Sequence, residues 1–284
     1  MSPFPQMIDV AVFNRQEIRR SAPVRKSVAS LRLVVESALC AIVLGRHCLA
    51  SMKLVAPRPK VFAIGFNKTA TSSLHDLFRA AGFHSNHGER WRDSGSAFFH
   101  LLWDAYCDGV PTDFVEFDDR YPNSKFILQV REIDSWIASR LEHIERRPAE
   151  RGNAISADWV VDDDAVCDWI RQRNDHHLRV LAHFADRPGD LLVINFIRDS
   201  DAAGKVMKFL GNETSVEKPH ANQKPSGSSA SRHQERIDRC FDRLNVPPEE
   251  RSTDLICLSL MQTDNEVAGV PADTSEIREG RFGL

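Results

Sequence analysis

The stretch Gly65-Phe66-Asn67-Lys68-Thr69-Ala70-Thr71-Ser72-Ser73 decides the fold of this chain. Directly before it lies the apolar run 61–64, which is typical of a buried parallel strand. Directly after it, one helix face is marked by Leu74, Leu77, Phe78 and Ala81. The stretch is therefore predicted to be a tight turn between a strand and a helix. Such a turn aims backbone N–H groups and the positive end of a helix dipole at one point, where a lysine and hydroxyls complete a cradle for phosphate or sulfate.

Strands and helices alternate along the chain beyond this turn. Further buried strands are predicted at 125–130 and 191–196, and helices at 95–107, 134–144, 162–184 and 200–210. The last helix is expected to end at Gly211, and the His-rich segment 84–92 is expected to be a loop. Alternation of this kind favours a three-layer α/β fold with a central parallel sheet covered on both faces.

The composition divides the chain into three parts. The stiff segment Pro57-Arg58-Pro59 separates an N-terminal extension, 1–57, from an α/β core, 58–224. From Pro225 the chain is small and polar, so 225–284 is predicted to be a partly mobile C-terminal extension with short helices near 232–244 and 253–261.

The bulk properties exclude several classes of function. The chain has 284 residues and a net charge of −3, which gives no general attraction to nucleic acid or to an anionic membrane. Its six cysteines include no C-x-x-C pair, so a zinc or redox motif is not supported. We interpret them as reduced thiols in a cytoplasmic protein.

Residues 28–50 form a predicted amphipathic helix within 26–52. Charged residues interrupt its apolar run, which is too short to cross a bilayer. Its apolar face comprises Val28, Leu31, Val35, Ala38, Leu39 and Ile42. Packing on the domain or on a partner, and peripheral attachment to a membrane, are the alternatives.

The spacing of the turn argues against a triphosphate. The triphosphate-binding loop places four residues and a second glycine before its lysine, whereas two residues separate Gly65 from Lys68. Arg131 directly follows the second predicted strand, and Ser139 lies two helical turns later. Ligands of open α/β sheets bind at the carboxyl ends of strands, so Arg131 and Ser139 are expected beside the turn, where they could hold a second phosphate.

Together these segments resemble the sulfotransferase family that uses 3′-phosphoadenosine-5′-phosphosulfate (PAPS). The family carries a strand, a loop like P-K-T/S-G-T-T and a helix, matched here by residues 67–73. It also carries a strand ending in arginine with a serine eight residues later, matched by 121–131 and Ser139. A third similarity comprises Phe209-Leu210-Gly211 and Pro219-His220-Ala221-Asn222. The resemblance spans about 60–224.

The resemblance implies a P-loop-NTPase-like sulfotransferase core that moves a sulfuryl group from PAPS to an acceptor hydroxyl, carbohydrate or lipid-linked acceptors being options. The product would be 3′-phosphoadenosine-5′-phosphate (PAP), and no metal is expected. The implied 5′-phosphosulfate site comprises Lys68, Thr69, Ala70, Thr71, Ser72 and Ser73, and Arg131 with Ser139 would hold the 3′-phosphate. Lys68 would also stabilise charge in the transition state. Ala70 stands where the family has glycine, and its methyl group is accommodated if φ there is negative.

The general base has two leading candidates, His87 and Asp113, with His84 as a rival. Alternatively, His87 is a histidine of a surface loop and Asp113 caps a turn or a helix. Lys224 could reach the nucleotide or simply be solvated. Two groups are expected to face solvent: the acidic residues Glu116, Asp118 and Asp119, and the basic run Arg171, Arg173, His176, His177 and Arg179, for which contact with an anionic acceptor is the other option.

Two other functions fit the same residues. A nucleotide kinase or NTPase would require magnesium-dependent ATP turnover, which the loop spacing does not favour. A non-catalytic member of the fold would bind nucleotide without transfer.

Overall fold

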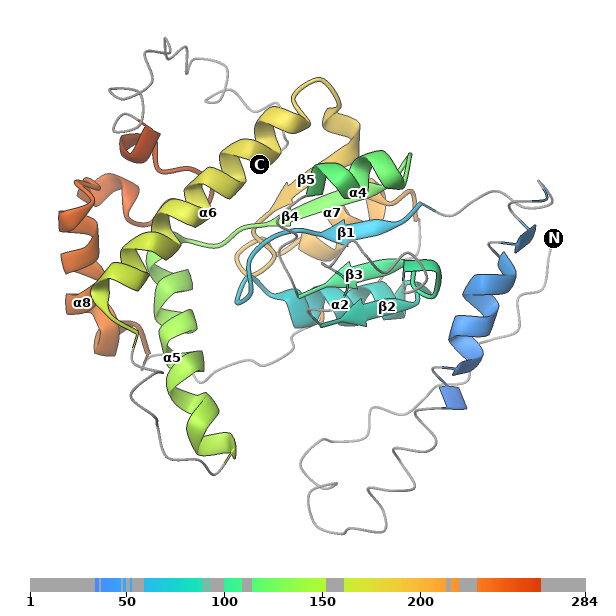
Figure 1. Cartoon of the computed structure of the whole chain (residues 1–284), viewed down its shortest axis with the longest axis horizontal. Coiled ribbons are helices and arrows are strands. Elements are labelled where there is room, and N and C mark those ends of the chain that lie inside the picture. Colours follow the sequence, from blue (N-terminus) through green and yellow to red (C-terminus); the bar gives the residue numbers. More distant parts are fainter. Residues whose placement is uncertain are drawn as a thin grey trace.

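The computed structural model describes residues 34–35, 37–46, 48–49, 52, 59–88, 91, 100–108, 114–151, 161–212, 216–219 and 229–261. At its centre is a five-stranded sheet of order β2-β3-β1-β4-β5, in which every pairing is parallel. Helices flank the sheet, as Figure 1 shows. The predicted three-layer α/β class with a parallel sheet is therefore confirmed.

The strands are short and closely follow the apolar runs. They are β1 Val61–Ala63, β2 Ser85–His87, β3 Ala105–Cys107, β4 Lys125–Gln129 and β5 Leu191–Ile194. The predictions for β1, β4 and β5 are confirmed. Those for β2 and β3 are wrong, because 84–92 was expected to be a loop and 95–107 a helix. Pairing with β1, such as Val61 with Ala105, holds β3 extended, although three residues are too few for a periodic pattern.

The helices cover both faces of the sheet. They are α2 Thr71–Ala80, α4 Phe114–Arg120, α5 Ile133–Arg151, α6 Asp163–His183, α7 Ala202–Phe209 and α8 Ser229–Arg243, with 3-10 turns η4 Pro188–Asp190 and η5 Pro248–Glu250. The predicted helices at 162–184 and 200–210 are confirmed, and Gly211 follows the latter with a φ of 66°. The helix predicted at 134–144 is longer than expected.

Alternate residues of β1 supply two different cores. Val61 and Ala63 pack with α2 and α7 on one face, while Phe62 and Ile64 pack with α4 and α6 on the other. This alternation is the two-residue period of a strand, so both faces of the sheet are covered by apolar side chains. Because every pairing is parallel, all five strands end at one edge of the sheet, and the site lies at that edge.

A third core joins the C-terminal segment to the α/β unit. Ile237, Cys240 and Phe241 of α8 pack with Trp136 of α5 and Ile170 of α6. Backbone bonds add to this, since the N–H of Ile133 donates to the carbonyl of Thr253 at 3.0 Å. Residues 229–261 are therefore packed against the core, and the domain boundaries drawn from composition stay predictions.

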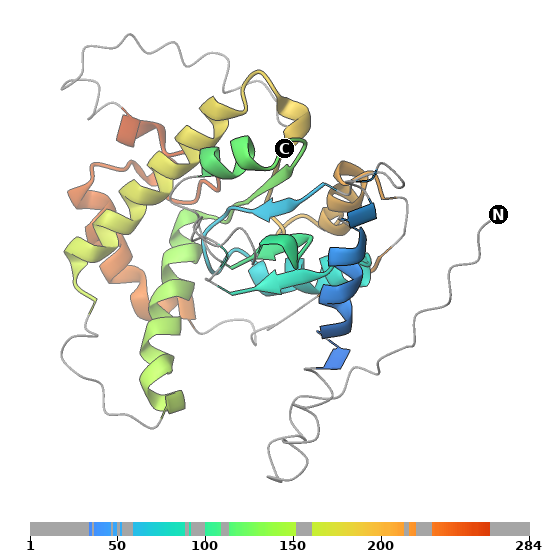
Figure 2. The ribbon, with the colours of Figure 1, turned by 45° about the vertical axis from the view of Figure 1, so that its right-hand side comes forward.

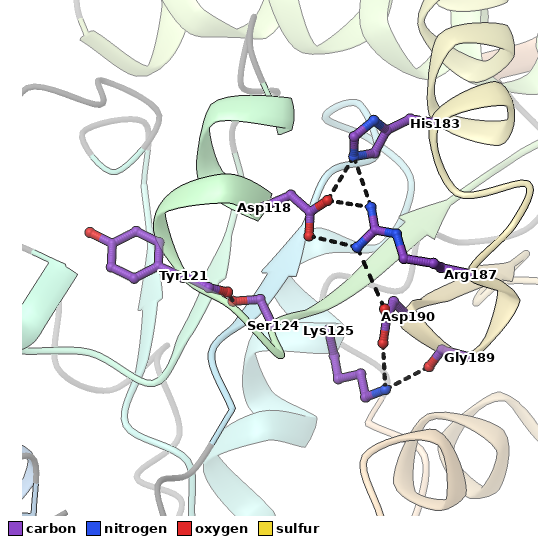
Figure 3. Close-up of polar contacts among 8 residues, drawn as sticks. All are labelled: Asp118, Tyr121, Ser124, Lys125, His183, Arg187, Gly189 and Asp190. Carbon is purple, nitrogen blue, oxygen red and sulfur yellow. Dashed lines mark hydrogen bonds and ion pairs between the residues drawn. The ribbon is translucent and has the colours of Figure 1, made fainter. Parts of the chain in front are cut away.

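A polar network joins α4, β4, α6 and η4 at the amino edge of the sheet (Figure 3). Asp118 of α4 accepts hydrogen bonds from Arg187 and from His183 Nε2, the latter at 2.7 Å. Lys125, the first residue of β4, donates to the carbonyl of Gly189 at 2.6 Å and to Asp190 at 3.0 Å. The expectation that Asp118 faces solvent is wrong: burial favours a raised pKa, but the bonds from Arg187 and His183 outweigh it and hold the pKa of Asp118 below its usual value.

Candidate active site

The candidate site lies at the carboxyl edge of the parallel sheet. The predicted turn, 65–70, follows β1, and Arg131 comes two residues after β4. His87 is the last residue of β2, and Asp108 directly follows β3. Because all strands run in the same direction, their ends bring these residues to one edge, which is where ligands of such sheets bind.

The carbonyl groups of the turn are anchored by side chains. The acceptors are the carbonyls of Ile64, Phe66, Asn67 and Lys68. Their donors, in the same order, are His176 Nε2 at 2.8 Å, Thr69 Oγ1 at 2.5 Å, Trp136 Nε1 at 2.9 Å and Arg131 Nη1 at 2.9 Å. Four of the five consecutive carbonyls from 64 to 68 therefore have a fixed direction.

The anchored carbonyls set the direction of the loop N–H groups. In a trans peptide unit the N–H points away from the carbonyl, so the N–H groups of Asn67, Lys68 and Thr69 are directed away from the anchors. Lys68 and Ala70 adopt left-handed conformations, with φ of 69° and 72°. Alternation of left-handed residues with others makes the backbone concave toward its N–H groups, which is the geometry of an anion-binding nest.

The start of α2 adds further donors. Its N-cap, Ala70, has no side-chain hydrogen bond to the first turn, and that turn holds no acidic residue. The first N–H groups of a helix lack partners within the helix, and the dipole there favours an anion. Of the predicted hydroxyls, those of Thr69, Thr71 and Ser73 belong to buried residues, while Ser72 is only half-buried. Ser72 is thus the most accessible hydroxyl of the turn.

Packing explains the first two residues of the turn. A Cβ at Gly65 would lie 2.2 Å from the carbonyl oxygen of Gln129, so only glycine fits between β1 and β4. The Gly65 N–H donates to Gln129 Oε1 at 2.6 Å. Phe66 packs its ring edge-on against Trp136 and His176, with centroids 5.5 and 5.3 Å away. These contacts fix the turn to β4, α5 and α6.

Ala70 has a positive φ of 72°. The expectation that its methyl group requires a negative φ is therefore wrong. A non-glycine residue in this region is strained by about 1–2 kcal/mol, partly offset by the unfolded-state entropy that glycine adds. We expect Ala70→Gly to raise the free energy of unfolding by about 0.5 kcal/mol. The reverse change at Gly211, where φ is also positive and a Cβ would meet nothing within 4 Å, should lower it by about 1 kcal/mol. Urea unfolding of both variants checks this, and destabilisation by Ala70→Gly would contradict it.

Arg131 lies against the turn as predicted. Besides its bond to the Lys68 carbonyl, its Nε donates to Ser135 Oγ at 2.9 Å. Burial lowers the pKa of Arg131, against the effect of Glu132 and Asp134. Ser139 is buried one helical turn beyond Ser135, on the same face of α5. Ser135 was missed by the sequence reasoning, although its spacing of four residues before Ser139 marks that face.

Of the candidate bases, His87 lies at the site. Its Nε2 is 3.3 Å from Ser72 Oγ, and its Nδ1 is 3.8 Å from Asp108 Oδ2. His84 is buried before β2, at the opposite edge, with Nδ1 2.8 Å from the Leu102 carbonyl. Asp113 and Lys224 lie outside the described residues. Asp108 was missed because no motif marks it.

The expectation that the basic run of α6 is solvated is wrong for three of its residues: Arg173, His176 and His177 are buried. Arg173 Nη2 donates to the carbonyls of Arg131, at 2.9 Å, and Asp254. Its burial lowers the pKa of Arg173 to about 10, against the effect of Asp254. α6 packs on the sheet and on the C-terminal segment, so its polar residues reach backbone carbonyls on both sides. Arg173 and His176 thus hold the backbone at Arg131 and Ile64, next to the site.

Acid pH should weaken the fold through His176. Burial lowers the pKa of His176 to about 4, against about 6.5 for an unfolded chain. The unfolded state therefore binds more protons below about pH 6.5, so stability that is complete above that pH is lost as the pH falls toward 4. We expect the loss of unfolding free energy between pH 7 and pH 5 to be about 2 kcal/mol smaller in His176→Gln than in the native chain. Urea unfolding at both pH values checks this, and an equal loss in His176→Gln and in the native chain would contradict it.

The family comparison agrees with this geometry. The model of the sulfotransferase domain matches residues 60–227, which is more than half of the chain and includes the whole turn, Arg131 and His87. No curated protein matches the chain. The predicted resemblance is confirmed by the family model, and the chain belongs to the sulfotransferase domain family.

Proposed function

We propose that this protein transfers a sulfuryl group from PAPS to an acceptor hydroxyl. The observation that carries the proposal is the anchored turn, in which the carbonyls of residues 64, 67 and 68 accept bonds from His176, Trp136 and Arg131. The N–H groups of residues 68 and 69 point away from the last two of these anchors, by the geometry of the trans peptide. That arrangement fits a tetrahedral anion such as the 5′-phosphosulfate. Arg131 beside the turn fits the second phosphate of the same ligand.

Each residue has a distinct proposed role. The loop N–H groups and Ser72 hold the 5′-phosphate, and Lys68 stabilises the charge that develops on the leaving oxygen. Arg131 uses two of its five N–H donors on the Lys68 carbonyl and on Ser135, so its guanidinium retains donors for the 3′-phosphate. Ser139, which lies on the same face of α5 as Ser135, would add a hydroxyl. PAPS supplies the sulfuryl group, and PAP remains after transfer. No metal is part of the proposal.

His87 is the proposed general base. It lies at the end of β2, within hydrogen-bonding reach of Ser72 in the turn, where an acceptor hydroxyl would approach the sulfur. Asp108, on the Nδ1 side of the ring, would hold the imidazole with Nε2 toward the acceptor. Asp113 is kept as the alternative base. The acceptor class and the cytoplasmic location stay predictions.

Direct binding of PAP tests the proposal. Titration calorimetry should detect binding to the native chain, and Arg131→Ala should weaken it on the order of 100-fold, because a charge-assisted pair is lost from a partly buried site. Arg171→Ala, which removes an arginine paired with Asp168 on the exposed side of α6, should change nothing. The proposal fails if the native chain does not bind PAP or if Arg131→Ala binds it as well.

Transfer itself is tested separately. Radiolabelled PAPS offered with a panel of saccharides and small alcohols should label at least one acceptor. Binding of PAP without labelling would favour the non-catalytic alternative, and magnesium-dependent ATP turnover would favour a kinase or NTPase.

A further inference from the structure

The N-terminal helix, described at 34–35, 37–46 and 48–49, is docked to the domain by one face. Val43 is only 2% exposed, and Arg46 forms an ion pair with Asp104, which directly precedes β3. Figure 2 shows this helix, in blue, beside the sheet domain. The attachment point is thus at the amino edge of the sheet.

The opposite face of the same helix is apolar and exposed. Its exposed side chains include Val34 at 65%, Ile42 at 63%, Leu49 at 43% and, in the turn that follows, Met52 at 67%. At about 100° per residue these four positions fall within about one quarter of the helix circumference, and Val43 lies across from them. Of the eight large apolar side chains that are strongly exposed among the described residues, six belong to 34–52. A concentration of this kind marks a contact surface.

The charge of the N-terminal sequence indicates the kind of partner. Residues 1–58 contain nine Lys and Arg against three Asp and Glu, although the whole chain has a net charge of −3. The apolar stripe therefore belongs to a positive part of the sequence, within a chain of negative net charge. An anionic lipid surface complements both properties, because it takes up apolar side chains and attracts flanking basic residues. A second copy of the chain would instead bring two positive regions together.

We propose that the exposed face of this helix, defined by Val34, Ile42, Leu49 and Met52, binds the surface of an anionic membrane. The helix lies in the head-group region with its apolar stripe inserted, while Val43 and Arg46 keep it attached to the domain. No helix within the described ranges has the length and hydropathy needed to span a bilayer, which fits a helix that lies on the membrane. The proposal is independent of the sulfotransferase activity.

Vesicle flotation of the full chain tests the proposal. Phosphatidylcholine vesicles containing phosphatidylserine should bind the native chain at least about 10-fold more tightly than phosphatidylcholine alone, and added salt should reduce the difference. The double variant Ile42→Glu, Leu49→Glu should lose about 10-fold or more in binding to the anionic vesicles. Ile197→Glu is the matched control. The exposed fraction of Ile197, 45%, is similar to the 43% of Leu49, but Ile197 follows β5 and is not part of the helix, so its replacement should leave binding unchanged.

Three results would overturn the proposal. They are no binding of the native chain to anionic vesicles, equal binding by the double variant, or an equal loss in Ile197→Glu. Light scattering tests the alternative partner, a second copy of the chain. A dimer that dissociates in the double variant, together with no vesicle binding, would show that the stripe is an interface between two copies. Circular dichroism establishes that each variant is folded before it is compared.

Discussion

Replacement of Lys68 by alanine is expected to lower kcat for sulfuryl transfer by about 10²–10³-fold, because it removes the positive charge that we propose stabilises the leaving oxygen of the donor. The loop itself should persist, since Arg131 holds the backbone carbonyl of residue 68, which alanine retains. The left-handed φ of 69° at this position is likewise one that alanine adopts at residue 70 of the same loop. The measurement is the transfer rate from PAPS to an acceptor identified in the panel.

A matched variant separates charge from shape at this position. Lys68→Arg keeps the positive charge and should retain more activity than Lys68→Ala, although a planar guanidinium does not reproduce the position of an ammonium. PAP binding by Lys68→Ala should fall by less than its kcat, because an interaction made mainly in the transition state lowers kcat more than affinity. Unchanged transfer in Lys68→Ala would remove Lys68 from the mechanism.

His87→Gln is expected to lower kcat by about 10²–10⁴-fold, the usual contribution of a general base. Glutamine can still reach Ser72 but cannot take a proton from the acceptor hydroxyl. The measurement is kcat for transfer from PAPS in both proteins.

Two further variants distinguish the possible bases. Asp108→Asn keeps the shape of the side chain and should lower kcat by only about 10-fold, as expected for a group that orients the imidazole without taking the proton. If Asp113→Asn abolishes transfer while His87→Gln does not, the base is Asp113. PAP binding should survive in every one of these variants, which separates loss of chemistry from loss of the nucleotide site.

The sequence predicted the parts of the fold that carry long apolar runs. β4 and β5 belong to such runs, and the glycine turn identified β1. β2 and β3 were misassigned because Ser85–His87 is polar and Ala105–Cys107 is too short to show a period. Their extended conformation comes from pairing with β1 and with each other, which no local pattern encodes. His87 was consequently placed in a loop, although it ends a strand.

The residues whose type determines the chemistry of the site were predicted. The residues that hold the turn through contacts between distant parts of the sequence were missed. Arg131 was expected at the turn because it follows a strand of the same parallel sheet. Trp136 and His176 bond to backbone carbonyls, and such bonds have no signature in the sequence of either partner. A signal for α6 did exist: Arg173 and His177 continue the spacing of Val166, Ile170 and Val180, so they fall within the buried stripe.

The parallel sheet gives the molecule two unlike ends. Every strand ends at the edge of the sheet where the proposed anion-binding turn lies, and β3 begins beside the residue that holds the N-terminal helix. A protein held on a bilayer through that helix would therefore turn its catalytic end toward the surrounding water. Its acceptor would then arrive by diffusion from solution, and a sugar on a soluble molecule would be sulfated in preference to a head group in the membrane beneath it.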